Sequence, residues 1–204
     1  MKKLLAALSA VALPLTAAAQ AENYVIDPFH THPHFEIDHL GFATLRGMFS
    51  KTTGKFSIDR AAKTGSLEVT IPTATVHTGD IEREGRPRTR DEHLRQADFF
   101  NSAEFPNMTF KSTALTFAGE NPEQIEGNLT LLGVTKPVVL KIERWRCGPD
   151  PRTQGKRYQC GGNATGAFKR SDFGMKFGIP NVGDEVKRTI TTEALVPKAE
   201  AAAQ

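Results

Sequence analysis

Alternation of apolar and polar residues, with a period of two, recurs along most of this chain and restricts the folds that it can adopt. In the run 66–76, for example, apolar side chains occupy every second position, at Leu67, Val69 and Ile71. This is the pattern of a β-strand with one buried face. We count about eight such runs besides the short edge strand 24–27. The runs are residues 24–27, 34–40, 48–59, 66–76, 108–110, 125–131, 138–143, 164–169 and 185–196.

The connections between these runs indicate the fold class. Most are short turns, and parallel strands would need a helix between each strand pair. We therefore predict an all-β, eight-stranded antiparallel barrel or meander. A barrel of that size has an interior that is either filled by side chains or wide enough for one slim ligand.

One segment, about 79–105, interrupts the alternation with a helical pattern and three nearby phenylalanines. Thr89 and Glu92 form a capping box, which predicts a short helix that starts there. Phe99 and Phe100 follow, and adjacent residues cannot both enter one small core from a regular helix. We therefore interpret this insertion as a lid, with one phenylalanine sealing the barrel end and the other lining the interior. A plug that only closes the core is the alternative.

The N-terminus has the form of a targeting segment. Two lysines precede an apolar run (4–15) and the sequence Ala-Gln-Ala at 19–21, which predicts a signal peptide over residues 1–21, cleaved after about Ala21. The run is shorter than the roughly 20 residues that span a bilayer. The mature chain, 22–204, has the length of one domain and contains no later run of that length. In a two-membrane bacterium the expected location is the periplasm.

The charge balance argues against several partners. The formal net charge is +3, and it becomes +1 once the two lysines of the signal peptide are removed. We expect no nucleic-acid partner, because basic and aromatic residues are not interleaved. Five arginines, mixed with acidic residues, lie in the insertion. They indicate either a solvated loop or a rim that contacts an anionic head group. They are Arg83, Arg86, Arg88, Arg90 and Arg95.

The chain has two cysteines, Cys147 and Cys160. In an oxidising compartment an even pair predicts a disulfide, which here would close a loop rich in proline, glycine and arginine. The alternative, a redox or metal-binding pair, lacks a CxxC spacing and a nearby histidine.

Three histidines alternate near the start of the mature chain, at His30, His32 and His34. Such histidines share one face of a strand and can bind zinc. Pro28 and Pro33 disturb that strand, and no acidic or cysteine ligand follows at a matching spacing. We therefore predict no metal site, and because no Ser-His-Asp or Cys-His arrangement is visible, we predict no enzymatic activity. A metal-dependent periplasmic enzyme that uses these histidines, and a stress-related structural dimer with a filled barrel, are the alternatives.

Longer segments carry a resemblance that covers nearly all of the mature chain. They are YVIDPFHT (24–31), FEIDHLGF (35–42), RGMF (46–49), HLRQADFF (93–100), FPNMTFKS (105–112), GNLTLLGVTKP (127–137), KRSDFGM (169–175) and GDEV (183–186). In this order they resemble the YceI-like family of exported, lipocalin-like proteins that bind polyisoprenoids. The resemblance implies an eight-stranded barrel around an apolar channel that holds an amphiphilic isoprenoid, such as a quinone or polyprenyl lipid. It also implies no catalytic residues and no cofactor, and often a homodimer.

A channel of this kind needs aromatic and aliphatic lining, with few polar groups at one end. We predict that the lining includes Phe42, Phe49, Phe99, Phe100, Phe110, Phe168 and Phe173. We predict that the polar end is formed by His39, Arg46 and Arg170. An ion pair between Arg170 and Asp172 at a turn is the alternative for that arginine.

Overall fold

The computed structural model describes residues 21–197. Residues 1–20, which make up nearly all of the predicted signal peptide, and residues 198–204 lie outside the described residues. Across 21–197, no helix is long and apolar enough to cross a bilayer. The strands are β1 (Glu22–Ile26), β2 (His32–His39), β3 (Ala43–Phe49), β4 (Thr53–Asp59), β5 (Thr64–Pro72), β6 (Val76–His77), β7 (Asn107–Ala118), β8 (Asn121–Leu131), β9 (Val134–Pro149), β10 (Tyr158–Lys169) and β11 (Glu185–Leu195). The helices are α1 (Arg90–Leu94) and the 3-10 helices η1 (Thr73–Thr75), η2 (Pro151–Thr153) and η3 (Arg170–Phe173).

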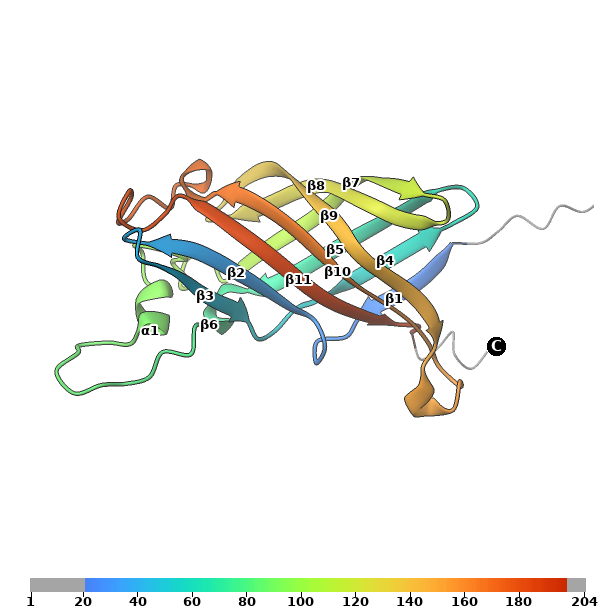
Figure 1. The fold of residues 1–204 in the computed structure, drawn as a ribbon, viewed down its shortest axis with the longest axis horizontal. Helices are drawn as coiled ribbons and strands as arrows, with labels where there is room; N and C mark the ends of the chain where they lie inside the picture. Colours follow the sequence, from blue (N-terminus) through green and yellow to red (C-terminus); the bar gives the residue numbers. More distant parts are fainter. Residues whose placement is uncertain (1–20, 198–204) are drawn as a thin grey trace, which may run out of the picture.

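Eight of the strands form a closed antiparallel barrel (Figure 1). Their hydrogen-bonded order is β1-β4-β5-β7-β8-β9-β10-β11, and β1 pairs with β11 to close the ring. The predicted eight-stranded antiparallel barrel is therefore confirmed. The predicted edge strand is wrong in one respect, because β1 has a partner on each side, β4 and β11. Closure gives each strand of the ring two neighbours and so protects its backbone hydrogen bonds.

Strands β2, β3 and β6 lengthen the wall at one end. Strand β2 pairs with the first half of β11, β3 pairs with β2, and β6 pairs with β3. The runs 48–59 and 66–76, predicted as continuous, are each interrupted: residues 50–52 separate β3 from β4, and η1 separates β5 from β6. At these two breaks the chain passes between the added wall, which contains β3 and β6, and the closed ring, which contains β4 and β5.

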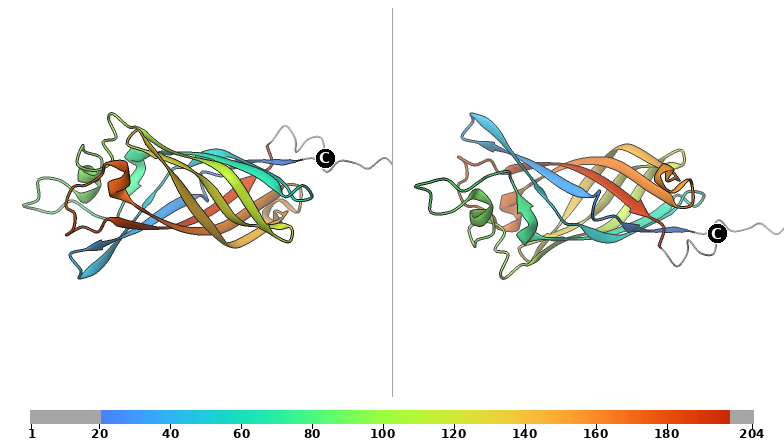
Figure 2. Two further views of the ribbon diagram at one scale, coloured as in Figure 1. Left: turned by 90° about the horizontal axis from the view of Figure 1, so that it is seen from above. Right: turned by 90° about the horizontal axis from the view of Figure 1, so that it is seen from below.

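The insertion lies across this same end of the barrel, beside η3 (Figure 2). Its helix, α1, is only five residues long, and turns make up most of the remaining segment. The Thr89 hydroxyl accepts a hydrogen bond from the Glu92 amide, and the Glu92 carboxylate accepts one from the Thr89 amide, so the predicted capping box is confirmed. The buried Asp91 carboxylate accepts hydrogen bonds from the amide and the hydroxyl of Thr78, which fastens α1 to the end of β6.

The opposite end of the barrel is closed by aromatic side chains. The Phe56 ring lies 5.8 Å from the Tyr24 ring and 5.2 Å from the Trp145 ring, measured between centroids. Tyr24, Phe56 and the neighbouring Ile58 are almost completely buried. A second, larger hydrophobic cluster, with Phe49, Leu129 and Leu140 among its members, covers the rest of the inner wall.

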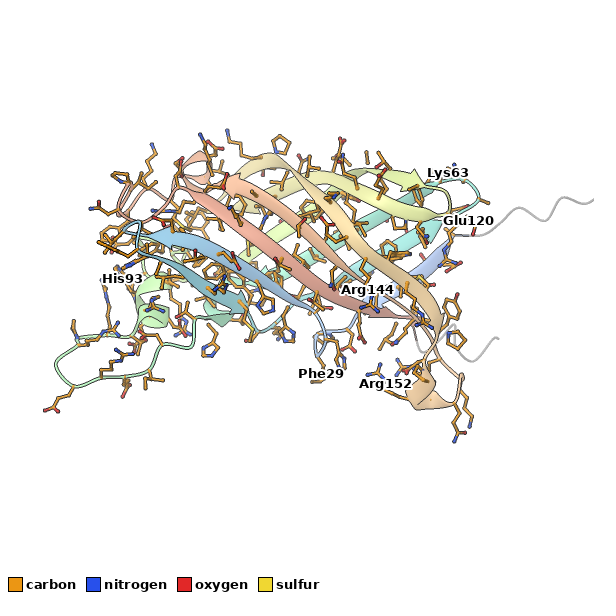
Figure 3. The ribbon with its side chains drawn as sticks, viewed as in Figure 1. Phe29, Lys63, His93, Glu120, Arg144 and Arg152 are labelled. Atoms are coloured by element: carbon orange, nitrogen blue, oxygen red, sulfur yellow. A yellow bond between two sulfur atoms is a disulfide. The ribbon has the colours of Figure 1, made fainter. Side chains whose placement is uncertain are left out.

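Cys147 on β9 and Cys160 on β10 lie directly opposite each other and form the predicted disulfide. Both strands run further than the alternation predicts, because their ladder continues to the pair Pro149 and Tyr158. The disulfide therefore lies inside the sheet, and the loop beyond it is shorter than expected. Arg152 of this loop lies at the end of the barrel opposite His93 of α1 (Figure 3).

Candidate functional site

The barrel encloses a cavity of about 370 Å³, and every strand of the ring contributes side chains to its wall. This volume falls in the range of about 300–1,000 Å³ that is typical of ligand pockets. The mouth of the cavity lies at the α1 end, where His93, Leu94 and the half-exposed Phe177 border it. The wall is mainly aliphatic and aromatic, and no aspartate or glutamate among residues 21–197 borders it.

Five of the seven phenylalanines predicted to line a channel border this cavity: Phe49, Phe99, Phe100, Phe110 and Phe168. The two adjacent ones lie at different depths. The Phe99 ring packs edge-on against Phe177 at the mouth, with 5.4 Å between centroids. The Phe100 ring packs edge-on against the buried Phe49, also at 5.4 Å. The insertion thus contributes aromatic side chains both to the mouth and to the inner wall.

The prediction for Phe42 is wrong, because this side chain is 92% exposed. Phe42 lies at the tip of the β2–β3 hairpin, after Leu40 and Gly41, whose φ angles of 61° and 71° form the turn. A turn of this kind ends the alternation of the preceding strand, so position 42 does not continue the inward face of β2.

The prediction for Phe173 is also wrong, although this side chain is almost completely buried, at 1% exposure. It belongs to η3 and does not border the cavity. Its ring packs edge-on against Phe168, with 5.2 Å between centroids. Phe173 therefore packs against a residue of the cavity wall, and Phe168 is the member of this pair that borders the cavity.

Arg170 borders the cavity but has its guanidinium bound elsewhere. It is 1% exposed, and it donates hydrogen bonds to the carbonyl oxygens of Gly183 at 2.7 Å, Val182 at 2.9 Å and Met175 at 3.2 Å. Burial lowers its pKa. The proposed ion pair with Asp172 is wrong, since that side chain is exposed and the guanidinium bonds to backbone oxygens. Arg170 ties the segment after η3 to the barrel and has little capacity left for a ligand.

The other two predicted polar residues lie near the mouth. His39 is at the end of β2, half-buried, and borders the cavity. Arg46 also borders it, but its side chain is 70% exposed and donates a hydrogen bond of 2.8 Å to the Glu36 carboxylate. Of the five arginines of the insertion only Arg90 borders the cavity, whereas Arg86 forms an ion pair with Asp80. The insertion loop is therefore mainly a solvated, ion-paired loop.

The residue that the sequence reasoning missed is Arg188, on β11. Its side chain points into the cavity wall, where Nε and Nη2 are buried and have no hydrogen-bond partner. Its guanidinium carbon lies 4.7 Å from the centre of the Phe168 ring. A signal was present in the sequence, because Arg188 occupies an apolar position in the alternation of Val186 and Ile190.

The three alternating histidines do not come together as one metal site in the described part of the chain. His30 instead forms a hydrogen bond of 2.8 Å with Asp27, in a group that also includes Glu193. Burial raises the pKa of Asp27, but the hydrogen bonds from His30 and from the Phe29 amide outweigh it and lower that pKa overall. Asp27 and His30 belong to the turn between β1 and β2, and Glu193 of β11 lies beside them, so the three side chains offer possible metal-ligand atoms within 4.8 Å of one another. His34 separately borders the cavity.

The chain is similar to known proteins over most of its length. A family model described as a YceI-like domain matches residues 24–194. A UPF0312 protein of Shewanella sp. (strain W3-18-1) is 36% identical over 197 residues, which cover 95% of this chain and 98% of that protein.

Two solved structures are also similar. The YCEI protein of Campylobacter jejuni matches with a TM-score of 0.62 and 28% identity, over 79% of this chain and 91% of that chain. A polyisoprenoid binding domain from Saccharophagus degradans, implicated in plant cell wall breakdown, matches with a TM-score of 0.58 over 85% of this chain and 98% of that chain. At 15% identity, the latter supports the fold alone. The family match extends over most of the sequence, and the chain belongs to the YceI-like family.

Proposed function

We propose that this protein binds an amphiphilic polyisoprenoid, a quinone or polyprenyl lipid, inside the barrel and carries or sequesters it in the periplasm. The observation that carries the proposal is the apolar cavity, which crosses the inside of a closed barrel and opens beside an aromatic insertion. The domain from Saccharophagus degradans, which shares the fold, is named a polyisoprenoid binding domain, and this supports the same class of ligand.

The free energy of burial is sufficient for such a ligand. At about 0.8 kcal/mol per buried CH₂ and roughly five carbons per isoprene unit, two or three units reach the gross free energy of micromolar binding, about 8 kcal/mol. Ordering of the chain and its preference for the membrane oppose this gain. Affinity is therefore expected to depend on how well the cavity shape and its few polar groups suit the lipid.

Native purification followed by organic extraction and mass spectrometry tests the proposal. We expect a co-purified lipid whose mass corresponds to an isoprenoid, in a ratio approaching one per chain. An extract without lipid, together with a barrel that does not take up added isoprenoid, would contradict it. Intact mass should show a mature chain that begins at Glu22 in the periplasmic fraction.

Binding without catalysis is part of this proposal, as is a homodimer. Elemental analysis of untagged protein should find less than stoichiometric metal, and stoichiometric zinc would instead favour an enzyme centred on the histidines.

Light scattering on the purified protein should give the mass of two chains, and the mass of one chain would contradict the dimer.

A further inference from the structure

Within residues 21–197, Arg188 differs from the other three arginines that border the cavity, because no polar partner is found for it. Arg46 pairs with Glu36, Arg90 donates to the Thr78 hydroxyl, and Arg170 donates to three backbone carbonyls. For Arg188, Nε and Nη2 are both buried without an acceptor, and none of the ion pairs found among residues 21–197 includes it.

The wall around Arg188 is shaped to hold its guanidinium in place. Phe168 presents its ring face to the guanidinium at 4.7 Å, and Phe173 packs edge-on against the same ring. On the neighbouring strand, Gly166 pairs with Arg188, and a Cβ at position 166 would lie 3.0 Å from Nη2. The same Cβ would lie 2.7 Å from the Val139 carbonyl oxygen, so glycine leaves room both for the neighbouring backbone and for the guanidinium.

The group is charged at neutral pH. Loss of solvation lowers the pKa of Arg188 to about 10, which is still well above the pH of the cell envelope. A buried cation with free N–H donors and no acceptor is unfavourable, and an aromatic face offsets only part of the lost solvation. An acceptor supplied by a ligand would satisfy these donors, and guanidinium N–H groups suit planar or tetrahedral oxygen groups.

We propose that Arg188 is the head-group site of the cavity and binds an acceptor oxygen of the lipid: a phosphate, a carboxylate or a quinone carbonyl. This inference rests on the proposed function and deepens it by naming the class of head group. The described cavity wall has no acidic side chain, so it has no carboxylate that could bind an ammonium head. A bare hydrocarbon would leave the Arg188 donors unsatisfied, so it should not be preferred over a lipid with an acceptor oxygen.

The position of Arg188 also orients the tail. Arg188 is near the start of β11, and Thr192 is four residues further along, roughly 13 Å at the usual rise of a strand. Thr192 pairs with Gly162, which pairs with Trp145. The tail therefore extends from Arg188 towards Trp145 and the closed end. Trp145 is the single tryptophan of the chain and borders the cavity, so it reports on the tail.

Lipid binding by delipidated full-length mature protein tests the proposal. The probes share one geranylgeranyl tail and differ in the head: a phosphate, a quinone, an alcohol and an amine. Binding is followed by Trp145 fluorescence and, independently, by native mass spectrometry. For the wild type we expect the phosphate or the quinone to bind at least about tenfold more tightly than the alcohol, and the amine to bind most weakly.

Two variants assign this preference to the guanidinium. Arg188→Met should weaken binding of the preferred probe by about 10- to 100-fold and leave the alcohol within about threefold of wild type. Arg188→Lys, which keeps the charge but loses the planar donor set, should give an intermediate affinity. Lys187→Met is the matched control, because Lys187 is exposed on the outer face of the same strand and its loss removes one positive charge as well.

The outcomes separate the two proposals. Tighter phosphate binding identifies an anionic head and tighter quinone binding a carbonyl head, and either supports the inference if Arg188→Met removes the preference. Equal affinity for all heads, or a preference that survives in Arg188→Met, would overturn the head-group site and leave lipid binding intact. Failure of every probe to bind the wild type would overturn the proposed function and this inference together.

Discussion

Arg170 and Arg188 both have guanidinium nitrogens buried at the cavity wall, but their surroundings differ. Arg170 donates to three backbone carbonyls, which would be left without donors if it were removed. Arg188 has free donors, and its removal would leave no acceptor behind. Burial alone therefore does not show whether a polar residue serves the fold or a ligand, whereas the hydrogen-bond partners do.

Substitution of each arginine by methionine should show this difference in stability. In delipidated protein, Arg170→Met should lower the free energy of unfolding by about 3–5 kcal/mol, because it breaks several buried hydrogen bonds to a charged donor. Arg188→Met should raise it by about 1–3 kcal/mol, because it removes unsatisfied buried donors. Urea unfolding measures both, and comparable destabilisation by the two changes would indicate that Arg188 is a structural residue.

Phe99 and Phe42 provide a second paired test at single positions. Phe99 borders the mouth of the cavity, so Phe99→Arg places a hydrated cation in the path of the tail and should reduce co-purified lipid at least about tenfold. Phe42 is exposed on a hairpin tip, so Phe42→Arg should leave lipid content unchanged. Extraction with mass spectrometry measures both, and light scattering checks that the oligomeric state is unaltered. Equal loss in the two variants would contradict the assigned mouth.

At the scale of elements, the insertion is held by side chains that bond to backbone and to neighbouring loops. A helix as short as α1 has little stability of its own. It is fastened by Asp91 to Thr78, and by Arg95, which donates to the carbonyl oxygens of Ala74 and Val76. Asp80 adds a tie at the start of the loop, because it accepts from the Arg86 guanidinium and the Arg90 amide.

The hydrogen bonds that Asp80 accepts predict that the stability of the protein depends on pH in the acid range. The hydrogen bond from Arg86, together with the Arg90 amide, lowers the pKa of Asp80 to about 2. Its folded-state pKa is thus below the ordinary value of about 3.9, so its stabilising contribution is complete above that value and is lost as pH falls towards about 2. Melting temperatures between pH 2 and 7 should fall less steeply at the acid end in Asp80→Asn than in the wild type. Parallel curves for the two proteins would contradict this role.

The Cys147–Cys160 disulfide joins neighbouring strands at the closed end of the barrel. On the chain-entropy estimate, a closed loop of about fourteen residues contributes roughly 3 kcal/mol. The double variant Cys147→Ala/Cys160→Ala should lose about that much stability in urea, and it should become insensitive to reductant. Retention of wild-type stability by this variant would show that the ladder alone holds β9 and β10 together.

At the scale of the whole molecule, closure of the sheet produces the binding site. The ring closes through β1 and β11, from opposite ends of the described chain, and aromatic packing seals one end while the insertion lies at the other. The result is an apolar space bordered by the insertion, and its described wall contains the buried, unpartnered guanidinium nitrogens of Arg188. This shape suits an amphiphile that enters tail first and is held by its head near the entrance.

The local pattern of the sequence determined the all-β class, the antiparallel strands, the start of α1 and the disulfide. These follow from period-two alternation, from a capping box within four residues and from a count of two cysteines. Each depends on neighbours along the chain or on the chemistry of the compartment, so each could be predicted without coordinates.

Only the tertiary structure decided which side chains face the cavity and what they bond to. The turn before Phe42 and the 3-10 helix that carries Phe173 both reset the alternation, so a strand's pattern could not be extended across them. The alternation of its strand is enough to assign Arg188 to the inward face. Whether it has a polar partner depends on the neighbouring strand, which places Gly166 and Phe168 beside it. Contacts between strands far apart in sequence are set by closure of the barrel, and no local pattern encodes them.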